Sequence, residues 1–458
     1  MKQTSLGLLL LLVGCTTAPK ADFAVTTTAA GPAIAGFGAC MNPYLYAHPN
    51  MPVEISAAAV ADLETKVKAL HPQFVRIFFL NSWWDEDKDQ PVNKDRGGMR
   101  QSLIRTIQLA QDSGATVLLQ LWYDPSGYQD IDNVTRRFTN AIKELRQKHG
   151  LTAIQYATIQ NEPDGNPDDV KLDRYPKVYR AFDRALREAG IRDQVKIIGG
   201  DLVGEKWQHW LEVIGREMSD QCDGYSFHAY WDYWRISTFQ HHIAEVKHAL
   251  ETMPAKQRRP MYVTEFGARG FRERPGLEPG KSDTGKPLAD VPVYSFEIAI
   301  FMMETINAGF AGTIQWDLYD VWYDRKMGYG LIGPVERGFD RKPGYWLLKM
   351  FTSACKPGWR GMKIRGEVED VWVAALRAPP ALRGSEGELS VFVLNRVHGP
   401  KRVTVSGLSA GRTYKAQMWN GDGKGMLQEL EPVRADDKGV VAVTVPEMGV
   451  QVLTTMSK

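Results

Sequence analysis

The stretch that decides the fold is Ile154-Gln155-Tyr156-Ala157-Thr158-Ile159-Gln160-Asn161-Glu162-Pro163. Its apolar part is typical of a buried β-strand, and the stretch stops at a carboxylic acid followed by proline. Proline biases the preceding residue toward extended backbone and supplies no amide hydrogen for a sheet. We therefore predict that Glu162 lies in extended backbone at the end of a strand and projects beyond the sheet.

Eight short apolar runs of this kind occur between residues 35 and 352, and stretches with helical spacing separate them. The runs are residues 36–41, 74–80, 117–123, 154–160, 195–200, 224–228, 261–265 and 312–316. The first intervening stretch has apolar residues at helical spacing after Ser56, a candidate N-cap. Eight strand and helix units predict a (β/α)8 TIM barrel. An open dinucleotide-binding sheet fits less well, because no glycine-rich phosphate loop follows the first run.

The remainder of the chain, residues 353–458, has short alternating segments with frequent glycine. This pattern is typical of a smaller antiparallel β-sandwich domain. Residues 23–28 alternate in the same way, so we expect the segment 16–34 to contribute a linker and a strand to that sandwich. The predicted order is residues 1–15 as a signal segment, 16–34 as linker and strand, 35–352 as barrel and 353–458 as sandwich.

The chain has 458 residues and a formal net charge of +2, which gives no support for a nucleic-acid partner. Residues 6–13 form an apolar run that is too short to cross a bilayer and suits a secretory signal. Residues 12–15 resemble a bacterial lipobox, which implies that Cys15 carries a lipid. The alternative is an ordinary signal peptide cleaved nearby. We expect a monomer anchored in the bacterial cell envelope, facing the periplasm or the exterior.

Polar and aromatic residues gather at the carboxyl ends of the predicted strands, where barrel enzymes place their chemistry. They are Arg76, Trp122, Asn161, Glu162, His228, Tyr230, Glu265 and Trp316. The fourth and seventh strands lie on opposite sides of an eight-stranded barrel, so Glu162 and Glu265 can face each other. Hydrolysis of a glycosidic bond needs such a pair, one acid to protonate the leaving oxygen and one carboxylate at the anomeric carbon.

These motifs resemble those of clan A glycoside hydrolases, which are retaining enzymes on (β/α)8 barrels. The residues that carry the resemblance are Asn161-Glu162-Pro163, Val263-Thr264-Glu265-Phe266-Gly267, His228-Ala229-Tyr230, Arg76 and Trp316, in that clan's order. The opening strand Gly36-Phe37-Gly38-Ala39 and the terminal sandwich are most similar to family 30, with families 39 and 5 as alternatives.

The resemblance implies a role for each residue. Glu162 matches the acid/base and Glu265 the nucleophile. Asn161 matches the residue that binds the sugar 2-hydroxyl, and Arg76 the arginine beneath the nucleophile. Either Tyr230 or His228 matches the donor that orients Glu265.

Trp316 matches the floor of the subsite for the reacting sugar, and Trp122 joins it as a substrate-binding candidate. We expect the charge of Glu265 to raise the pKa of Glu162, and Arg76 to keep Glu265 ionised. A carboxyl separation of roughly 5–5.5 Å is predicted, which corresponds to retention.

Further aromatic residues follow the strand ends and suit sugar faces. They are Trp83, Trp84, Tyr123, Tyr128, Trp231, Tyr233, Trp234, Tyr319, Trp322 and Tyr323. A slight basic excess in residues 268–290 suggests an acidic sugar in the substrate. No cofactor is expected. The alternatives are a metal-dependent barrel hydrolase, which would need clustered histidines or carboxylates, and a non-catalytic glycan-binding lipoprotein on a similar barrel.

Overall fold

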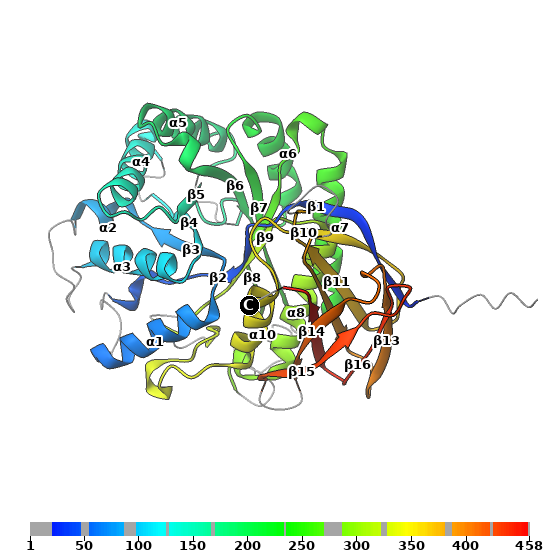
Figure 1. Ribbon diagram of the computed structural model, residues 1–458. Helices are drawn as coiled ribbons and strands as arrows, with labels where there is room; N and C mark the ends of the chain where they lie inside the picture. Colours follow the sequence, from blue (N-terminus) through cyan, green and yellow to red (C-terminus); the bar gives the residue numbers. More distant parts are fainter. Residues whose placement is uncertain are drawn as a thin grey trace, which may run out of the picture.

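The computed structural model describes residues 21–46, 55–86, 98–124, 128–165, 170–232, 235–269, 286–321, 328–380, 387–421 and 425–456. The chain forms a barrel surrounded by helices and, beside it, a second body made only of strands (Figure 1). The predicted Cys15 lipid anchor and the signal segment lie outside the described residues. Among the described helices, none is long and apolar enough to cross a membrane.

Eight parallel strands form the barrel in the order β2-β9-β8-β7-β6-β5-β4-β3. They are β2 (Gly36–Ala39), β3 (Phe74–Phe79), β4 (Thr116–Leu121), β5 (Ile154–Ile159), β6 (Lys196–Leu202), β7 (Gly224–Asp232), β8 (Met261–Arg269) and β9 (Gly312–Gln315). A parallel bridge between Cys40 and Arg76 joins the two ends of this order and closes the barrel. The predicted (β/α)8 fold is confirmed.

Nine α-helices of the described chain accompany these strands. They are α1 (Ala57–Leu70), α2 (Asn81–Glu86), α3 (Met99–Asp112), α4 (Ile131–Gln147), α5 (Tyr175–Glu188), α6 (Trp207–Met218), α7 (Ile236–Thr252), α8 (Pro292–Ala308) and α10 (Pro343–Ala354). Ser56 caps α1 as predicted, because its hydroxyl accepts a hydrogen bond of 3.2 Å from the amide of Ala59. Leu63, Val67 and Leu70 form the buried stripe of α1.

Two strands run further than their sequence patterns indicate. The apolar runs end at His228 and Glu265, yet β7 continues to Asp232 and β8 to Arg269, and these extensions pair with each other. His228, Tyr230 and Glu265 therefore lie within paired strands and not at strand ends. This correction matters because a paired backbone holds side chains more precisely than a loop does.

The inward side chains of the barrel form layers, since alternate residues of a strand share a face. On β3 the inward residues are Phe74, Arg76 and Phe78. Phe74 contacts the rings of Tyr156 and Tyr262 at centroid distances of 5.3 and 5.7 Å, which makes an aromatic floor. Above that floor lies a layer of polar and charged side chains, which the site uses.

The second body is one nine-stranded sheet in the order β15-β14-β17-β12-β11-β10-β1-β13-β16. Its strands are β1 (Phe23–Ala33), β10 (Arg360–Arg365), β11 (Val371–Arg377), β12 (Leu389–Asn395), β13 (Lys401–Ser406), β14 (Thr413–Asn420), β15 (Leu427–Arg434), β16 (Val441–Val445) and β17 (Gly449–Thr454). Residues from both ends of this order, such as Val405 and Tyr414, share one hydrophobic core, so the sheet folds over on itself as a sandwich.

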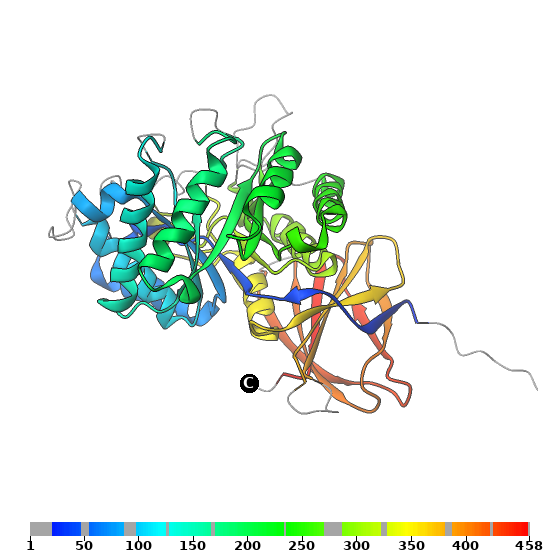
Figure 2. The same ribbon diagram turned by 90° about the horizontal axis from the view of Figure 1, so that it is seen from above.

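The N-terminal strand β1 runs from the barrel across to the sandwich (Figure 2). It pairs antiparallel with β10 and parallel with β13, so the sandwich is not wholly antiparallel. The sequence pattern missed β10 and β15. The side chains of β15 are exposed or half-buried throughout, so this strand lacks the alternation that would have indicated it.

The helix α8 lies between the barrel and the sandwich. Twelve of its seventeen residues are buried, and it is apolar on every side because both bodies pack on it. At this boundary Asn307 donates to the carbonyl of Val373 at 3.0 Å, and the indole of Trp372 donates to Glu304 at 2.9 Å. Core residues of the two bodies belong to one continuous hydrophobic cluster.

Candidate active site

Glu265 is held by two donors at the barrel mouth. One carboxylate oxygen accepts from the Arg76 guanidinium and the other accepts from the Tyr230 hydroxyl. Only 7% of Glu265 is exposed. Of the two predicted candidates for orienting Glu265, Tyr230 therefore makes the contact, and His228 contacts a different carboxylate.

That carboxylate is Glu162, whose Oε1 lies 2.9 Å from His228 Nδ1. The Glu162 side chain is 29% exposed, so it meets the solvent that Glu265 does not. The backbone of Glu162 has a φ of 49°, in the left-handed region. The predicted extended backbone before proline is therefore wrong.

Tertiary contacts explain this departure. The strand β5 ends at Ile159, but the amides of Gln160 and Asn161 still donate to Leu121 and Trp122 at 2.8 Å. The turn at Glu162 follows directly. A non-glycine residue with positive φ costs about 1–3 kcal/mol, and such strain persists where the surroundings hold the residue in place.

The two carboxylates are close together. One oxygen of Glu162, one oxygen of Glu265 and one ring nitrogen of His228 all lie within 4.8 Å of one another. These three residues also offer the donor atoms that a metal ion would need. Arg76 and Tyr230 already occupy both oxygens of Glu265, so a cation there would compete with a buried guanidinium.

Arg76 is the central cation of the site and is 1% exposed. It also donates to Asn161 Oδ1, which leaves the Nδ2 amino group as the donor on the amide. Burial works to lower the pKa of Arg76, but the charges of Asp201 and Glu265 outweigh it and raise that pKa above its ordinary value. Arg76 is therefore a fixed positive charge under all working conditions.

A cavity of about 260 Å³ opens above the two glutamates. It is lined by Phe78, Trp122, Asn161, Glu162, Tyr230, Glu265, Trp316 and Tyr329. Phe78 stacks on Trp122 with centroids 5.1 Å apart and lies 5.8 Å from Trp316. Flat aromatic walls over a floor of hydrogen-bonding groups suit the apolar faces and hydroxyl edges of a sugar.

Six of the eight strand-end candidates line this cavity, and the other two, Arg76 and His228, contact Glu265 and Glu162 respectively. Trp316 precedes a cis peptide bond to Asp317. Phe78 and Tyr329 were missed. The signal for Phe78 was its position two residues after Arg76, on the same strand face. The sequence offered no comparable signal for Tyr329, which lies in the connection after β9.

Asp201 is the other residue that the sequence reasoning missed. It lies at the end of β6, is 0% exposed, and has Arg76 at 3.7 Å and His228 at 3.6 Å. Burial would raise the pKa of Asp201, but Arg76 and His228 hold it well below the usual range. The available signal was an acidic residue directly after the apolar run 195–200.

His228 is fully buried among these charges. Burial works to lower its pKa, but the charge of Glu265 and the contacts with Asp201 and Glu162 outweigh that effect and raise the pKa of His228 to about 9. The imidazole is therefore predominantly cationic near pH 7, with one ring nitrogen toward each of two acids.

Several residues of the expected aromatic rim do not line the cavity. Trp84, Tyr128, Trp231 and Tyr319 are buried in the hydrophobic core. Trp83 packs against the ring of Tyr44, with centroids 5.5 Å apart. Tyr123, with 38% exposure, does reach solvent beside Trp122. Tyr233, Trp234, Trp322, Tyr323 and most of the basic segment 268–290 lie outside the described residues.

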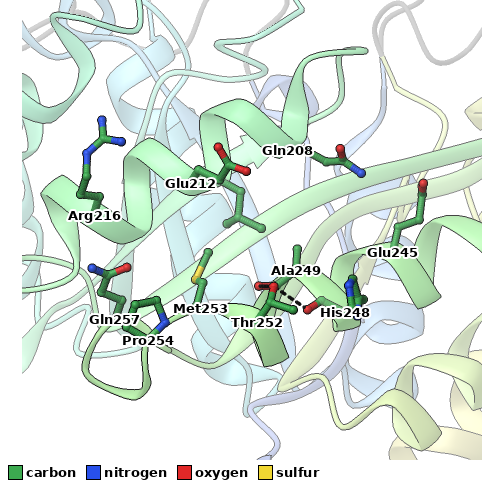
Figure 3. A pocket seen from close by; sticks show the side chains of 11 residues that line it. Gln208, Glu212, Arg216, Glu245, His248, Ala249, Thr252, Met253, Pro254 and Gln257 are labelled. Atoms are coloured by element: carbon green, nitrogen blue, oxygen red, sulfur yellow. Dashed lines mark hydrogen bonds between the residues drawn. The ribbon is translucent and has the colours of Figure 1, made fainter.

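A larger hollow, of about 590 Å³, lies between α6 and α7 (Figure 3). Its lining runs along both helices and includes the residues that lead into β8, so the hollow lies on the outer helix layer and reaches the amino-terminal end of the barrel. Glu212 and Glu245 come from different helices there, and Arg216 lies on the same helix as Glu212. Barrel enzymes place their chemistry at the carboxyl end of the strands.

No family model matches the chain, and no curated protein matches it in sequence. The structure, however, is similar to many solved structures. A glycoside hydrolase family 30 subfamily 8 xylanase from Clostridium acetobutylicum is 13% identical, with a TM-score of 0.64 over 94% of this chain and 99% of that one. The catalytic domain of a family 30 xylanase from Talaromyces cellulolyticus is 12% identical, with a TM-score of 0.68 over 95% and 100%.

A family 51 arabinofuranosidase from Xanthomonas axonopodis pv. citri is also 12% identical, with a TM-score of 0.68 over 95% and 100%. The fold, barrel and sandwich together, is thus that of (β/α)8 glycoside hydrolases of clan A. The expected likeness to family 30 is confirmed at the level of the fold. Family 51, which the sequence motifs did not suggest, has the same architecture.

Proposed function

We propose that the protein is a retaining glycoside hydrolase that cleaves O-glycosidic bonds in a β-linked oligo- or polysaccharide. The observation that carries this proposal is the pair Glu162 and Glu265, with carboxylate oxygens within 4.8 Å across the barrel mouth. That spacing fits the roughly 5–5.5 Å of retaining enzymes. It is shorter than the roughly 6.5–9.5 Å that admits a water in inverting enzymes.

The environments of the two acids support different roles. Glu265 is buried, and Arg76 and Tyr230 hold its two oxygens in place, which suits a nucleophile. Glu162 is more exposed and lies within 4.8 Å of the Glu265 carboxylate, whose charge disfavours a second negative charge, and this suits an acid that later acts as a base.

The reaction then has two steps. First, Glu162 gives its proton to the glycosidic oxygen while a Glu265 oxygen attacks the anomeric carbon, so the leaving sugar departs as an alcohol. Second, Glu162 takes a proton from water, the water oxygen attacks the anomeric carbon, and Glu265 leaves as a carboxylate. Asn161 is the donor for the hydroxyl next to the anomeric carbon.

The cavity supports a neutral sugar at the reacting position. Its described walls are aromatic or uncharged apart from the two glutamates, and Arg76 is occupied by protein partners. The similar structures include xylanases and arabinofuranosidases, so several sugars and linkages occur on this architecture. The expected acidic sugar depends on residues 270–285, which lie outside the described residues.

A mechanism-based label tests the proposal. A set of 2-deoxy-2-fluoro aryl glycosides should leave one sugar covalently attached to Glu265, detected by intact-protein and peptide mass spectrometry. Glu265→Gln should abolish the label and lower turnover by orders of magnitude. Glu212→Gln, on the exposed face of α6, is the matched control and should keep full activity.

Leaving-group dependence tests the acid. Glu162→Ala should be far less damaging on an aryl glycoside with a good leaving group than on a natural glycan, since acid assistance contributes roughly 10²–10⁴-fold. Equal damage on both substrates would contradict the role of Glu162. Proton NMR of the first-released anomer distinguishes retention from inversion.

A metal-dependent hydrolase is the second candidate, because Glu162, His228 and Glu265 form a set that can hold a cation. Chelation followed by added Mg²⁺, Mn²⁺ or Zn²⁺ separates the two. The two-glutamate mechanism requires that activity survive chelation unchanged.

We also propose that Cys15 is lipidated and holds the enzyme at the bacterial cell envelope. Cys15→Ser should move the protein from the membrane fraction to the soluble fraction, and an unchanged distribution would contradict lipidation.

A further inference from the structure

Asp201 is a buried charge that does not line the cavity, yet several donors hold it in place. Gln120, Thr264 and Ser226 all donate to its carboxylate, and Ser226 Oγ also accepts from its amide at 2.8 Å. These donors come from β4, β8 and β7. The protein therefore uses three other strands of the barrel to hold one acid.

The two cations next to Asp201 each hold one of the glutamates. Asp201 Oδ2 lies 3.7 Å from Arg76, which donates to Glu265. Asp201 Oδ1 lies 3.6 Å from His228 Nε2, and the Nδ1 atom of the same ring contacts Glu162. Glu162 and Glu265 thus share one buried counter-charge, through two different cations.

We propose that Asp201 is a positioning residue that sets the protonation and orientation of both glutamates, through His228 for Glu162 and through Arg76 for Glu265. This inference depends on the proposed glycosidase function for its kinetic consequences. Its effect on the pKa of His228 does not depend on that function, because this pKa is a property of the folded protein alone.

The direction of the effect follows from charge. Removing a negative charge makes proton binding less favourable at every neighbouring group, so the pKa of His228 should fall. The two limbs of the pH–rate profile, which report the pKa values of the catalytic acid and base, should also move to lower pH. The charged and titratable groups that face His228 and Asp201 are Arg76 on β3, Glu162 and Asp164 after β5, Tyr175 on α5, and Glu265 on β8. Each of them remains in the variant, so the sign does not change.

The test is Asp201→Asn, which keeps the shape and removes the charge. NMR of ¹³C-labelled histidine should show the His228 ring titrating about one unit or more below the wild-type protein, since an opposite charge this near shifts a pKa by about 1–3 units. On an aryl glycoside, kcat should fall at least tenfold with little change in KM, and both limbs should move down.

Asp183→Asn is the matched control. Asp183 is an acid with 13% side-chain exposure that pairs with Arg187 and Arg192 on the outer helix layer. It should leave the pH limbs and the His228 titration unchanged. A lower kcat for Asp201→Asn with an unmoved profile and titration would mean a merely structural role and would overturn the proposal, as would full activity.

The wild-type protein supplies a test that does not need the variant to fold. A His228 ring that titrates at or below its ordinary value near 6.5 would overturn the proposal directly. If the wild-type protein hydrolyses no glycoside, the proposed function fails, while the titration still decides whether Asp201 controls His228.

Discussion

Replacement of Arg76 by methionine should destabilise the protein by an amount that the structure defines. Arg76 is buried and has Asp201 at 3.7 Å, a pair whose side chains are both 0% exposed. At that distance and an effective dielectric constant of about 20, the attraction is about 4 kcal/mol. Removing one partner of a buried pair costs about 3–5 kcal/mol, and here Asp201 and Glu265 both lose the Arg76 cation, which leaves His228 as the cation beside Asp201. We therefore expect a loss of about 4 kcal/mol at pH 7.

Urea unfolding followed by tryptophan fluorescence and circular dichroism measures this loss. The deficit should shrink at pH 5, because a buried Asp201 without Arg76 takes up a proton more readily, and the protonated carboxyl has less need of the lost cation.

Arg100→Met is the control. Arg100 is also buried, but its partner Glu144 keeps a side-chain exposure of 29% and can return to water. A loss for Arg76→Met no larger than for Arg100→Met, or one that is the same at pH 5 and pH 7, would refute the reasoning.

Three further predictions follow from the same contacts. Tyr230→Phe removes one donor to Glu265 and should lower kcat about 10- to 100-fold with the fold intact, which steady-state kinetics and circular dichroism will show. Burial raises the pKa of Glu297 on α8 to about 8, so this group contributes stability that is lost as pH rises from about 4.5 to about 8. In thermal unfolding, Glu297→Gln should therefore be more stable than the wild-type protein at pH 9, but not at pH 4.5. The raised pKa of His228 contributes stability that is complete below pH 6.5 and lost by about pH 9, so the advantage of the wild-type protein over His228→Gln should narrow across that interval.

The location of the site was predictable because each barrel strand can be recognised from a short run of neighbouring residues. Apolar runs separated by helical spacing marked all eight strands, and the run ends marked Glu162, Glu265 and Trp316, whereas Arg76, also expected at a strand end, lies inside β3. The predictions that failed were the extended backbone at Glu162 and the strand ends at His228 and Glu265. In a regular strand, successive side chains point to opposite faces of the sheet, so Thr264 and Glu265 would lie on opposite faces.

A register shift between β7 and β8 overrides that alternation. Phe227 pairs with Val263, but His228 pairs with Glu265, so both Thr264 and Glu265 reach the barrel interior. Asp201 enters the interior by a similar route, with a positive φ of 56° beside a register shift in β6. The spacing of apolar residues in the sequence predicts neither of these irregularities.

The sequence alone therefore determined the barrel, its carboxyl-end site and the two glutamates, because burial and strand formation depend on neighbouring residues. The tertiary structure decided which partner each glutamate has. Tyr230 and Arg76 contact Glu265, His228 contacts Glu162, and Asp201 lies behind both. Those pairings join residues far apart in the chain, and bulges and left-handed turns set them. Such features are stable only when the surrounding strands hold them in place.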